Sequence, residues 1–187
     1  MCVYGDPMLT GEKVVLRHRT AADAPILDSA LHNEVETMMR AAGSAWRPRS
    51  VEEAEAKYRK ALESEPSDRQ VEFAVEEIAT GELAGEAQVW GIDLHNRMAH
   101  LGFTLLAPFR GRGLGTDVIR VLCDYGFRIR GLHRLQIDTL AENEPALRAS
   151  QKMGFTIEGR VRENAWIGHF ADEMILGQLA DEWFGRG

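Results

Sequence analysis

The stretch "PFRGRGLGTD", Pro108 to Asp117, places three glycines and two arginines within six residues. It follows the strand-like run "HLGFTLL" and precedes apolar residues spaced as on one face of a helix, namely Val118, Leu122, Tyr125 and Ile129. A loop that leaves a strand and opens a helix presents free backbone N–H groups, and the helix dipole adds positive potential there. The stretch therefore predicts an anion-binding site with phosphate as its obvious ligand.

The spacing of the glycines separates several kinds of phosphate loop. Glycines at 111, 113 and 115 allow positive φ and a close approach of the backbone, while Arg110 and Arg112 add charge. A P-loop is excluded because no lysine follows the last glycine. A dinucleotide fingerprint lacks its third glycine here, and the loop lies late in the chain. A tight turn with incidental arginines is the alternative if the loop is taken alone.

Periodicity along the rest of the chain predicts a mixed α/β domain. Alternating or β-rich runs predict strands before the loop at 13–19, 71–78, 81–93 and 97–106, and after it at 132–140, 155–164 and 171–179. Helical spacing predicts helices at 20–33, 50–65 and 143–155, besides the one after the loop. Ser50 and Asn143 are the expected N-caps of two of these helices.

Composition and charge describe an ordinary globular chain of 187 residues, which we expect to form a single domain, 1–187. The net charge of −7 argues against a nucleic-acid partner, which needs a basic face. Cys2 and Cys123 lie far apart and outside any Cys/His cluster, which predicts neither a metal site nor a disulfide framework. Without a secretion signal or a run of about 20 apolar residues, we expect a cytoplasmic protein with no membrane contact.

Two motifs in order resemble one known family. Arg110 to Gly115 matches the Arg/Gln-x-x-Gly-x-Gly/Ala pattern of the GCN5-related N-acetyltransferases (GNAT), and "NEPALRASQKMGF" resembles their second segment, an Asn leading a helix that ends in Gly-Phe. The segments 9–27 and 99–116 resemble the RimJ/RimL-type branch, which modifies protein N-terminal amines and various small amines. The resemblance is weakest from Asn33 to Ser67. It implies the GNAT fold, a mostly antiparallel, splayed sheet of about seven strands flanked by helices.

The resemblance also implies acetyl-coenzyme A as co-substrate, with its pyrophosphate on the loop amides and its pantetheine arm between splayed strands near "FTLL" and "LQIDTL". The amide near Leu106 would bind the thioester oxygen and Leu105 the pantetheine amides, unless both are plain strand residues. Asn143 caps its helix, contacts pantetheine, or does both. Lys152 meets the 3′-phosphate region or is a solvated lysine. The expected cofactor-binding residues are thus Leu105, Leu106, Arg110, Gly111, Arg112, Gly113, Leu114, Gly115, Thr116, Asn143 and Lys152.

The resemblance indicates a proton donor less directly. Ser150 stands where many relatives carry a Tyr whose hydroxyl protonates the departing thiolate. Ser150 is therefore either the catalytic acid or an ordinary helix residue, and a thiolate that leaves without a protein acid stays open. Ala146 occupies the place where the RimJ/RimL-type branch often has Ser, so no serine role is carried over there.

His100 is the candidate general base, because an ordinary histidine pKa of about 6.5 suits proton removal from an ammonium group. A half-buried or cross-strand histidine is the alternative. Glu86 on the preceding strand and Glu163 in the loop between the last strands compete for the same role. Asp138 and Asp172 are candidates to anchor a cationic substrate.

Together these residues predict an acyl-coenzyme A-dependent N-acyltransferase, foremost an acetyltransferase, in which an amine substrate attacks the thioester directly in a ternary complex. A succinyl-coenzyme A-dependent enzyme and a non-catalytic acyl-coenzyme A sensor are the alternatives. The acidic runs "EVETMM" and "VEEAEAKYRKALESE" either line a cleft for a cationic acceptor or form a solvated face. Trp46, in a linker, either borders that cleft or packs in a surface loop. A homodimer through the C-terminal strands or the Trp166 loop stays open.

Overall fold

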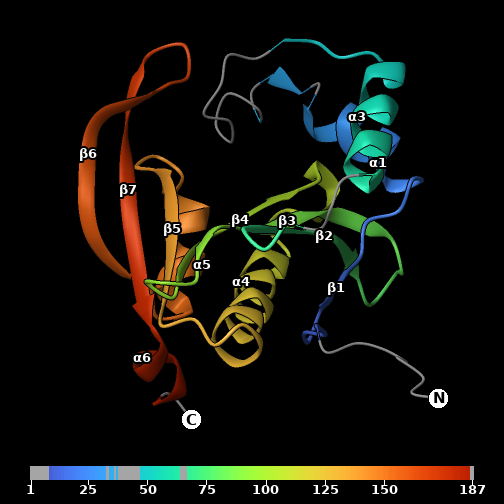
Figure 1. The fold of residues 1–187 in the computed structure, drawn as a ribbon. Helices are drawn as coiled ribbons and strands as arrows, with labels where there is room; N and C mark the ends of the chain where they lie inside the picture. Colours follow the sequence, from blue (N-terminus) through green and yellow to red (C-terminus); the bar gives the residue numbers. More distant parts are fainter. Residues whose placement is uncertain (1–8, 33, 36, 38–46, 64–66, 186–187) are drawn as a thin grey trace, which may run out of the picture.

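The computed structural model describes residues 9–32, 34–35, 37, 47–63 and 67–185. Its centre is a seven-stranded sheet in the order β1-β2-β3-β4-β5-β7-β6 (Figure 1). Neighbouring strands are antiparallel except β4 and β5, which are parallel. The mixed α/β fold with a mostly antiparallel sheet is therefore confirmed. The strands are β1 (Val14–Arg17), β2 (Gln70–Glu77), β3 (Leu83–Asp93), β4 (Met98–Leu105), β5 (Arg134–Leu140), β6 (Thr156–Trp166) and β7 (Phe170–Leu179).

Helices cover both faces of this sheet (Figure 1). One face, over β2 to β4, carries α1 (Asp23–Leu27), the turn η1 (Asp28–His32) and α3 (Val51–Glu63). The opposite face carries α4 (Leu114–Asp124), its continuation η3 (Tyr125–Ile129), and α5 (Glu144–Lys152), which packs beside α4. Two short helices complete the chain, η2 (Ala107–Phe109) and α6 (Ala180–Phe184). No described helix is both long and apolar enough to cross a membrane.

The core forms where α4 meets the sheet. Val118 and Leu122 of α4 are fully buried, as their spacing predicts, and each such side chain contributes about 1.5–3 kcal/mol. A Cβ on Gly126 would lie 2.9 Å from the side chain of Leu135, so a glycine lets the helix approach β5. Ile129 was predicted on the same face but is 43% exposed. The π-helical turn η3 adds a residue per turn and rotates Ile129 away from the core.

Both predicted N-caps are present. The hydroxyl of Ser50 accepts the N–H of Glu53, and the Glu53 carboxylate accepts the N–H of Ser50, both at 3.2 Å. Asn143 accepts the N–H of Ala146 at 3.4 Å. These local bonds fix where α3 and α5 begin.

Candidate active site

Strands β4 and β5 separate soon after they begin. Their pairing covers three residue pairs and ends at His100 and Gln136. Among the described residues no later rung joins them, although β4 continues to Leu105 and β5 to Leu140. Main-chain N–H and C=O groups along this gap are available to an extended ligand. The gap is the splayed pair of strands that the sequence resemblance implied.

The strand register decides which residues of β4 face the gap. The N–H of Leu106 donates to the carbonyl of Ala84 at 2.9 Å, so the Leu106 backbone points toward β3. Backbone groups of successive strand residues point to opposite sides, and therefore Phe103 and Leu105 face the gap. The prediction that the Leu106 amide binds the thioester oxygen is wrong, because that amide already has a partner. Leu105 stays a predicted pantetheine contact, and Phe103 joins it.

The glycine loop ends at Gly113, the N-cap of α4, with no side chain capping the helix. Gly111 and Gly113 have φ of +75° and +82°, which a residue with a side chain rarely adopts. A Cβ on Gly111 would meet no atom within 4 Å, so the space beside it is open. A Cβ on Gly115 would lie 3.0 Å from the ring of Phe103. The first turn of α4, Leu114 to Thr116, is thus an uncapped helix N-terminus that faces open space.

Both arginines of the loop have partners within the protein. The Nε of Arg110 donates to the carbonyl of Leu105 at 2.9 Å, and Arg112 forms an ion pair with the buried Glu77 at 2.7 Å. These bonds hold the loop in place, and a direct phosphate contact by either arginine stays a prediction. The sequence pattern missed Lys13, whose Nζ donates to the carbonyl of Arg112 at 3.0 Å. Nothing local indicates this cation, because it lies 99 residues earlier.

These features fit the diphosphate and pantetheine of acetyl-coenzyme A. The open space at Gly111 and the uncapped start of α4 suit a diphosphate, and the unpaired backbone of β4 suits the pantetheine amides. Ser150 adds a third observation. It is 1% exposed, and its hydroxyl has no hydrogen-bond partner among the described residues. Because buried polar groups are nearly always partnered, this hydroxyl is a natural contact for a bound group.

The remaining cofactor predictions fall on α5. Asn143 caps this helix and its Nδ2 donates to Thr139 Oγ1 at 3.1 Å, which ties α5 to the end of β5. The capping interpretation is confirmed, and a pantetheine contact by Asn143 stays a prediction. Lys152 is exposed in the last turn, where its contact with a 3′-phosphate also stays a prediction.

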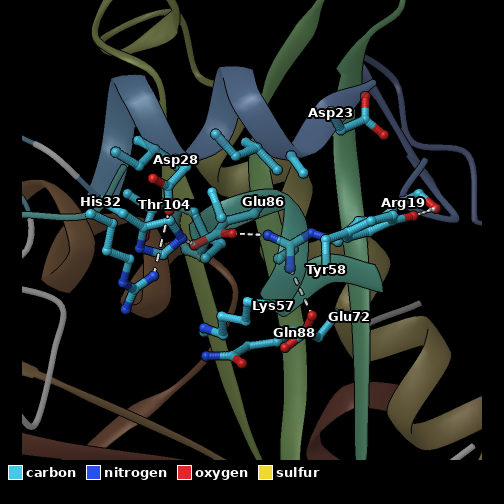
Figure 2. Close-up of a pocket in the computed structure, with 18 residues that line it drawn as sticks. Arg19, Asp23, Asp28, His32, Lys57, Tyr58, Glu72, Glu86, Gln88 and Thr104 are labelled. Carbon is cyan, nitrogen blue, oxygen red and sulfur yellow. Dashed lines mark hydrogen bonds and ion pairs between the residues drawn. The ribbon is translucent and has the colours of Figure 1, made fainter. Parts of the chain in front are cut away.

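A pocket of about 330 Å³ opens on the sheet face that α1 and α3 cover (Figure 2). Gln88, Gly102 and Thr104 of β3 and β4 form its floor. Phe103, whose backbone faces the gap, also lines it. The pocket and the gap therefore meet at β4, one on the face of the sheet and the other within its plane. Sequence patterns missed this pocket, because its residues come from six separate elements.

Arginines pair with the carboxylates of this pocket, with Arg19 shared between Glu72 and Glu86 (Figure 2). Arg17 holds the pKa of Asp23 at about 2. Burial lowers the pKa of His32, against the attraction of Glu86, so His32 is neutral at pH 7. Lys57 forms no ion pair or hydrogen bond with any described residue. The four lining carboxylates and their partners are Asp23 with Arg17, Asp28 with Arg49, and both Glu72 and Glu86 with Arg19.

His100 lies at the last rung before the gap. Its Nδ1 is 2.8 Å from Oδ2 of Asp138, and its ring stacks on Trp90 with centroids 4.3 Å apart. His100 is thus a cross-strand histidine, as the alternative interpretation held, and its place beside the gap keeps the general-base prediction open. Asp138 is engaged by His100, which speaks against its predicted role as an anchor for a cationic substrate. Glu86, the competing base, lines the pocket but is paired with Arg19.

The structure does not bring Glu163 to His100. Glu163 lies within β6, not in the predicted loop, at a register shift where its φ is +53°. Its N–H donates to Asp172 at 2.8 Å, and Asp172 also pairs with Arg160. Strands β5 and β7 separate β6 from β4, and neither Glu163 nor Asp172 lines the pocket. A base role for Glu163 and an anchoring role for Asp172 therefore gain no support.

The acidic run of α3 does not line the pocket. This helix contributes Ala54, Lys57 and Tyr58 to the wall, whereas Glu52 and Glu53 are exposed to solvent. For the acidic residues of this run that the structure describes, the interpretation as a solvated face is therefore confirmed. Trp46 and part of "EVETMM" lie outside the described residues. Within the described ranges, no group of His, Cys, Asp and Glu side chains is arranged to hold a metal ion.

Residues 13–156 match the model of the family described as "Acetyltransferase (GNAT) domain". The chain belongs to the GNAT acetyltransferase family. The gap between β4 and β5 and the glycine loop before α4 both lie within the matched region. Branch and acceptor are not specified by this match.

Individual relatives are similar over part or most of the chain. "Putative ribosomal N-acetyltransferase YdaF" of Bacillus subtilis is 30% identical over 57% of this chain and 58% of its own length. Spermidine N(1)-acetyltransferase of Escherichia coli K12 is 32% identical over 51% of this chain and 50% of its own. The chain thus spans about half the length of these curated relatives. A Vibrio cholerae spermidine N-acetyltransferase, solved with CoA and spermine, has the same fold, with TM-score 0.79, 23% identity, and 91% and 98% of the two chains covered.

Proposed function

We propose that this GNAT chain transfers the acetyl group of acetyl-coenzyme A to a primary amine by direct attack, with both substrates bound. One observation carries the proposal: the gap after His100 and Gln136 meets a pocket on one face of β4, while the uncapped start of α4 lies beside the opposite face. The gap suits an extended thioester arm and the pocket suits its acceptor. Membership of the RimJ/RimL-type branch is part of the proposal and is supported by the opening segment 9–27 and by the similarity to YdaF.

The chain's own residues then have separate roles. The loop amides from Gly111 to Thr116 bind the diphosphate. The backbone of Phe103 and the N–H of Leu105, whose carbonyl is held by Arg110, bind the pantetheine arm and polarise the thioester carbonyl. Bound acetyl-coenzyme A supplies the activated acetyl group. His100 removes a proton from the acceptor ammonium, and Ser150 donates a proton toward the departing sulfur.

The charges of the pocket narrow the acceptor class. Four carboxylates line the pocket, and the lining cations are Arg19, Arg49 and Lys57, of which Lys57 has no ion pair with a described residue. With His32 neutral, the lining residues thus carry one net negative charge, which suits one ammonium group better than a polycation. We therefore propose a monoamine acceptor, either a protein N-terminus or a small monoamine, although spermidine is the named substrate of some relatives.

Release of free thiol from acetyl-coenzyme A tests both parts of the proposal. The assay compares a peptide with a free N-terminus, small monoamines and spermidine, with succinyl-coenzyme A as a second donor. We expect acetyl transfer to at least one monoamine and a kcat/KM for spermidine that is no higher. Binding of acetyl-coenzyme A without transfer to any amine would indicate the sensor instead. A tenfold preference for spermidine would overturn the proposed monoamine acceptor and leave the proposed acetyl transfer standing.

A further inference from the structure

The side chains of His100 and Asp138 bridge β4 and β5 where main-chain pairing stops. His100 belongs to the last rung, opposite Gln136. Asp138 is two residues beyond Gln136 on β5, so it shares a sheet face with Gln136. The imidazole reaches it across the first unpaired step, with 2.8 Å between Nδ1 and Oδ2. Each side chain keeps 20% of its surface exposed.

Neighbours fix this pair from both strands. The Trp90 ring stacks on the imidazole at an interplanar angle of 23° and sets its plane. The second carboxylate oxygen of Asp138, Oδ1, accepts Nε2–H of Gln136 at 2.8 Å. Gln136 in turn accepts a hydrogen bond from Arg134 at 3.1 Å. Both oxygens of Asp138 are therefore engaged, and the imidazole is held by Asp138 at its edge and by Trp90 on its face.

The charge of Asp138 determines which nitrogen of His100 carries the proton. Burial alone would raise the pKa of Asp138, but hydrogen bonds from His100 and Gln136 outweigh burial and lower it. An ionised carboxylate only accepts hydrogen bonds, so Nδ1 carries the proton of the neutral imidazole and Nε2 carries the lone pair. Nε2 is then the proton acceptor of the ring.

His100 lies two residues from the floor of the acceptor pocket, although it is not among the residues that line the pocket. Gly102 lies two residues after His100 on the same face of β4 and forms part of the pocket floor. A Cβ on Gly102 would approach Gln88 Nε2 to 3.3 Å and Trp90 Nε1 to 3.7 Å. The glycine thus lets the Gln88 side chain and the edge of the Trp90 ring pack closely against β4 beside the pocket.

We propose that Asp138 is a positioning residue that holds His100 with Nε2 as the base for the incoming amine. The inference rests on the proposed function. Nε2 takes a proton from the acceptor ammonium, and the freed nitrogen forms the C–N bond as the C–S bond to coenzyme A breaks. Ser150 gives its hydroxyl proton to the departing thiolate and regains the second proton that the nitrogen loses, and the imidazolium releases its proton to solvent. Asp138 stabilises the imidazolium between these events.

The first test determines the tautomer of the His100 ring and needs no substrate. Long-range proton–nitrogen NMR of the imidazole distinguishes the two neutral tautomers. We expect His100 to carry its proton on Nδ1 in the parent protein and to lose this preference in Asp138→Asn. A parent ring protonated on Nε2 would overturn the proposal, whatever the activity of the protein.

The second test uses the pH dependence of kcat/KM. Besides His100, the charged group that acts on Asp138 is Arg134, which pairs with Glu158 of β6 and is also influenced by Glu182. Without the carboxylate the imidazolium is less stable, so Asp138→Asn should move the acidic limb to lower pH. We expect kcat to fall by about 10²–10⁴ with KM for acetyl-coenzyme A unchanged. In a His100→Gln background the same substitution should add no further loss.

Glu76→Gln is the matched control. It removes a carboxylate from another cross-strand ion pair, with Arg17 at 2.8 Å, at the far side of the sheet. It should leave the acidic limb in place. If Asp138→Asn also leaves the limb in place while the parent acetylates an amine, Asp138 only joins the two strands and the inference fails. If the parent acetylates no amine, the proposed function fails, and the NMR result still decides the tautomer.

Discussion

Ser150 shows at the scale of one residue what the fold adds to the sequence. Its position suggested a proton donor, but a short hydroxyl within a helix is usually satisfied locally. The structure instead buries the hydroxyl, with no partner among the residues it describes. Such a group destabilises the fold unless something else binds it.

Replacement of Ser150 by Ala separates the two explanations. We expect the free energy of unfolding to stay the same or rise by about 1 kcal/mol, because an unsatisfied hydroxyl is lost. We expect kcat to fall at least tenfold. The contrasting variant is Ser50→Ala, which removes a hydroxyl that does cap a helix and should cost about 1 kcal/mol without loss of kcat. Unchanged kcat in Ser150→Ala would show that Ser150 is not the proton donor.

For single residues, contacts with close neighbours in the sequence were predictable, and contacts with distant residues were not. Ser50 and Asn143 cap their helices through contacts three residues away, which a sequence displays directly. The error at Leu106 has the opposite origin. A strand residue faces one neighbour or the other according to its parity, and only the pairing with Ala84 reveals that parity.

At the scale of elements, Asp117 fastens the loop-bearing helix to the first strand. Its carboxylate accepts the N–H groups of Lys13 at 2.7 Å and Val14 at 3.0 Å, and it pairs with Arg120. Burial alone would raise the pKa of Asp117, but these bonds lower it below its usual value. The start of α4, and with it the glycine loop, is therefore held by a charge that must stay ionised.

Asp117→Asn should cost about 1–3 kcal/mol at pH 7, since the buried N–H groups lose a charged acceptor. The lowered pKa means that this stabilisation is complete above the unfolded pKa of about 4 and disappears as the pH falls through the folded value. Urea unfolding at several pH values should therefore show a parent–variant difference that shrinks below pH 4. Asp124→Asn on the same helix removes surface pairs with Arg128 and Arg120 and should cost less than about 1 kcal/mol. An equal loss of unfolding free energy in the two variants would contradict the proposed role of Asp117 in fastening α4 to β1.

Most elements were predictable because their periodicity is local. The three strands of the meander, the helix after the loop and the α5 segment all appear where the pattern places them. The prediction was wrong at the end of the helix after the loop. The π-helical turn η3 changes the helical period there, so Ile129 is exposed instead of buried. The extent of the gap between β4 and β5 depends on register, so only the family resemblance indicated it.

At the scale of the whole molecule, the pocket joins α1, η1 and α3 to the face of β2, β3 and β4 (Figure 2). The sequence left open whether α3 lines a cleft with acidic residues or exposes them to solvent, because acidic residues dominate that helix. Which helix face turns inward decides the chemistry, and α3 turns Lys57 and Tyr58 toward the pocket. The ion pairs of Arg19 with Glu72 and Glu86 join three segments that lie far apart in the sequence, so no local sequence pattern indicates them.

The central claim is that the start of α4 holds the diphosphate of acetyl-coenzyme A. Calorimetric titration of coenzyme A into Gly111→Asp tests it against Gly131→Asp. Both glycines have positive φ, +75° and +63°, and open space at Cβ, but Gly131 lies beyond the opposite end of the α4–η3 helix. We predict that Gly111→Asp weakens binding at least about tenfold by charge repulsion, while Gly131→Asp binds like the parent. Equal affinities in two folded variants would contradict the claim.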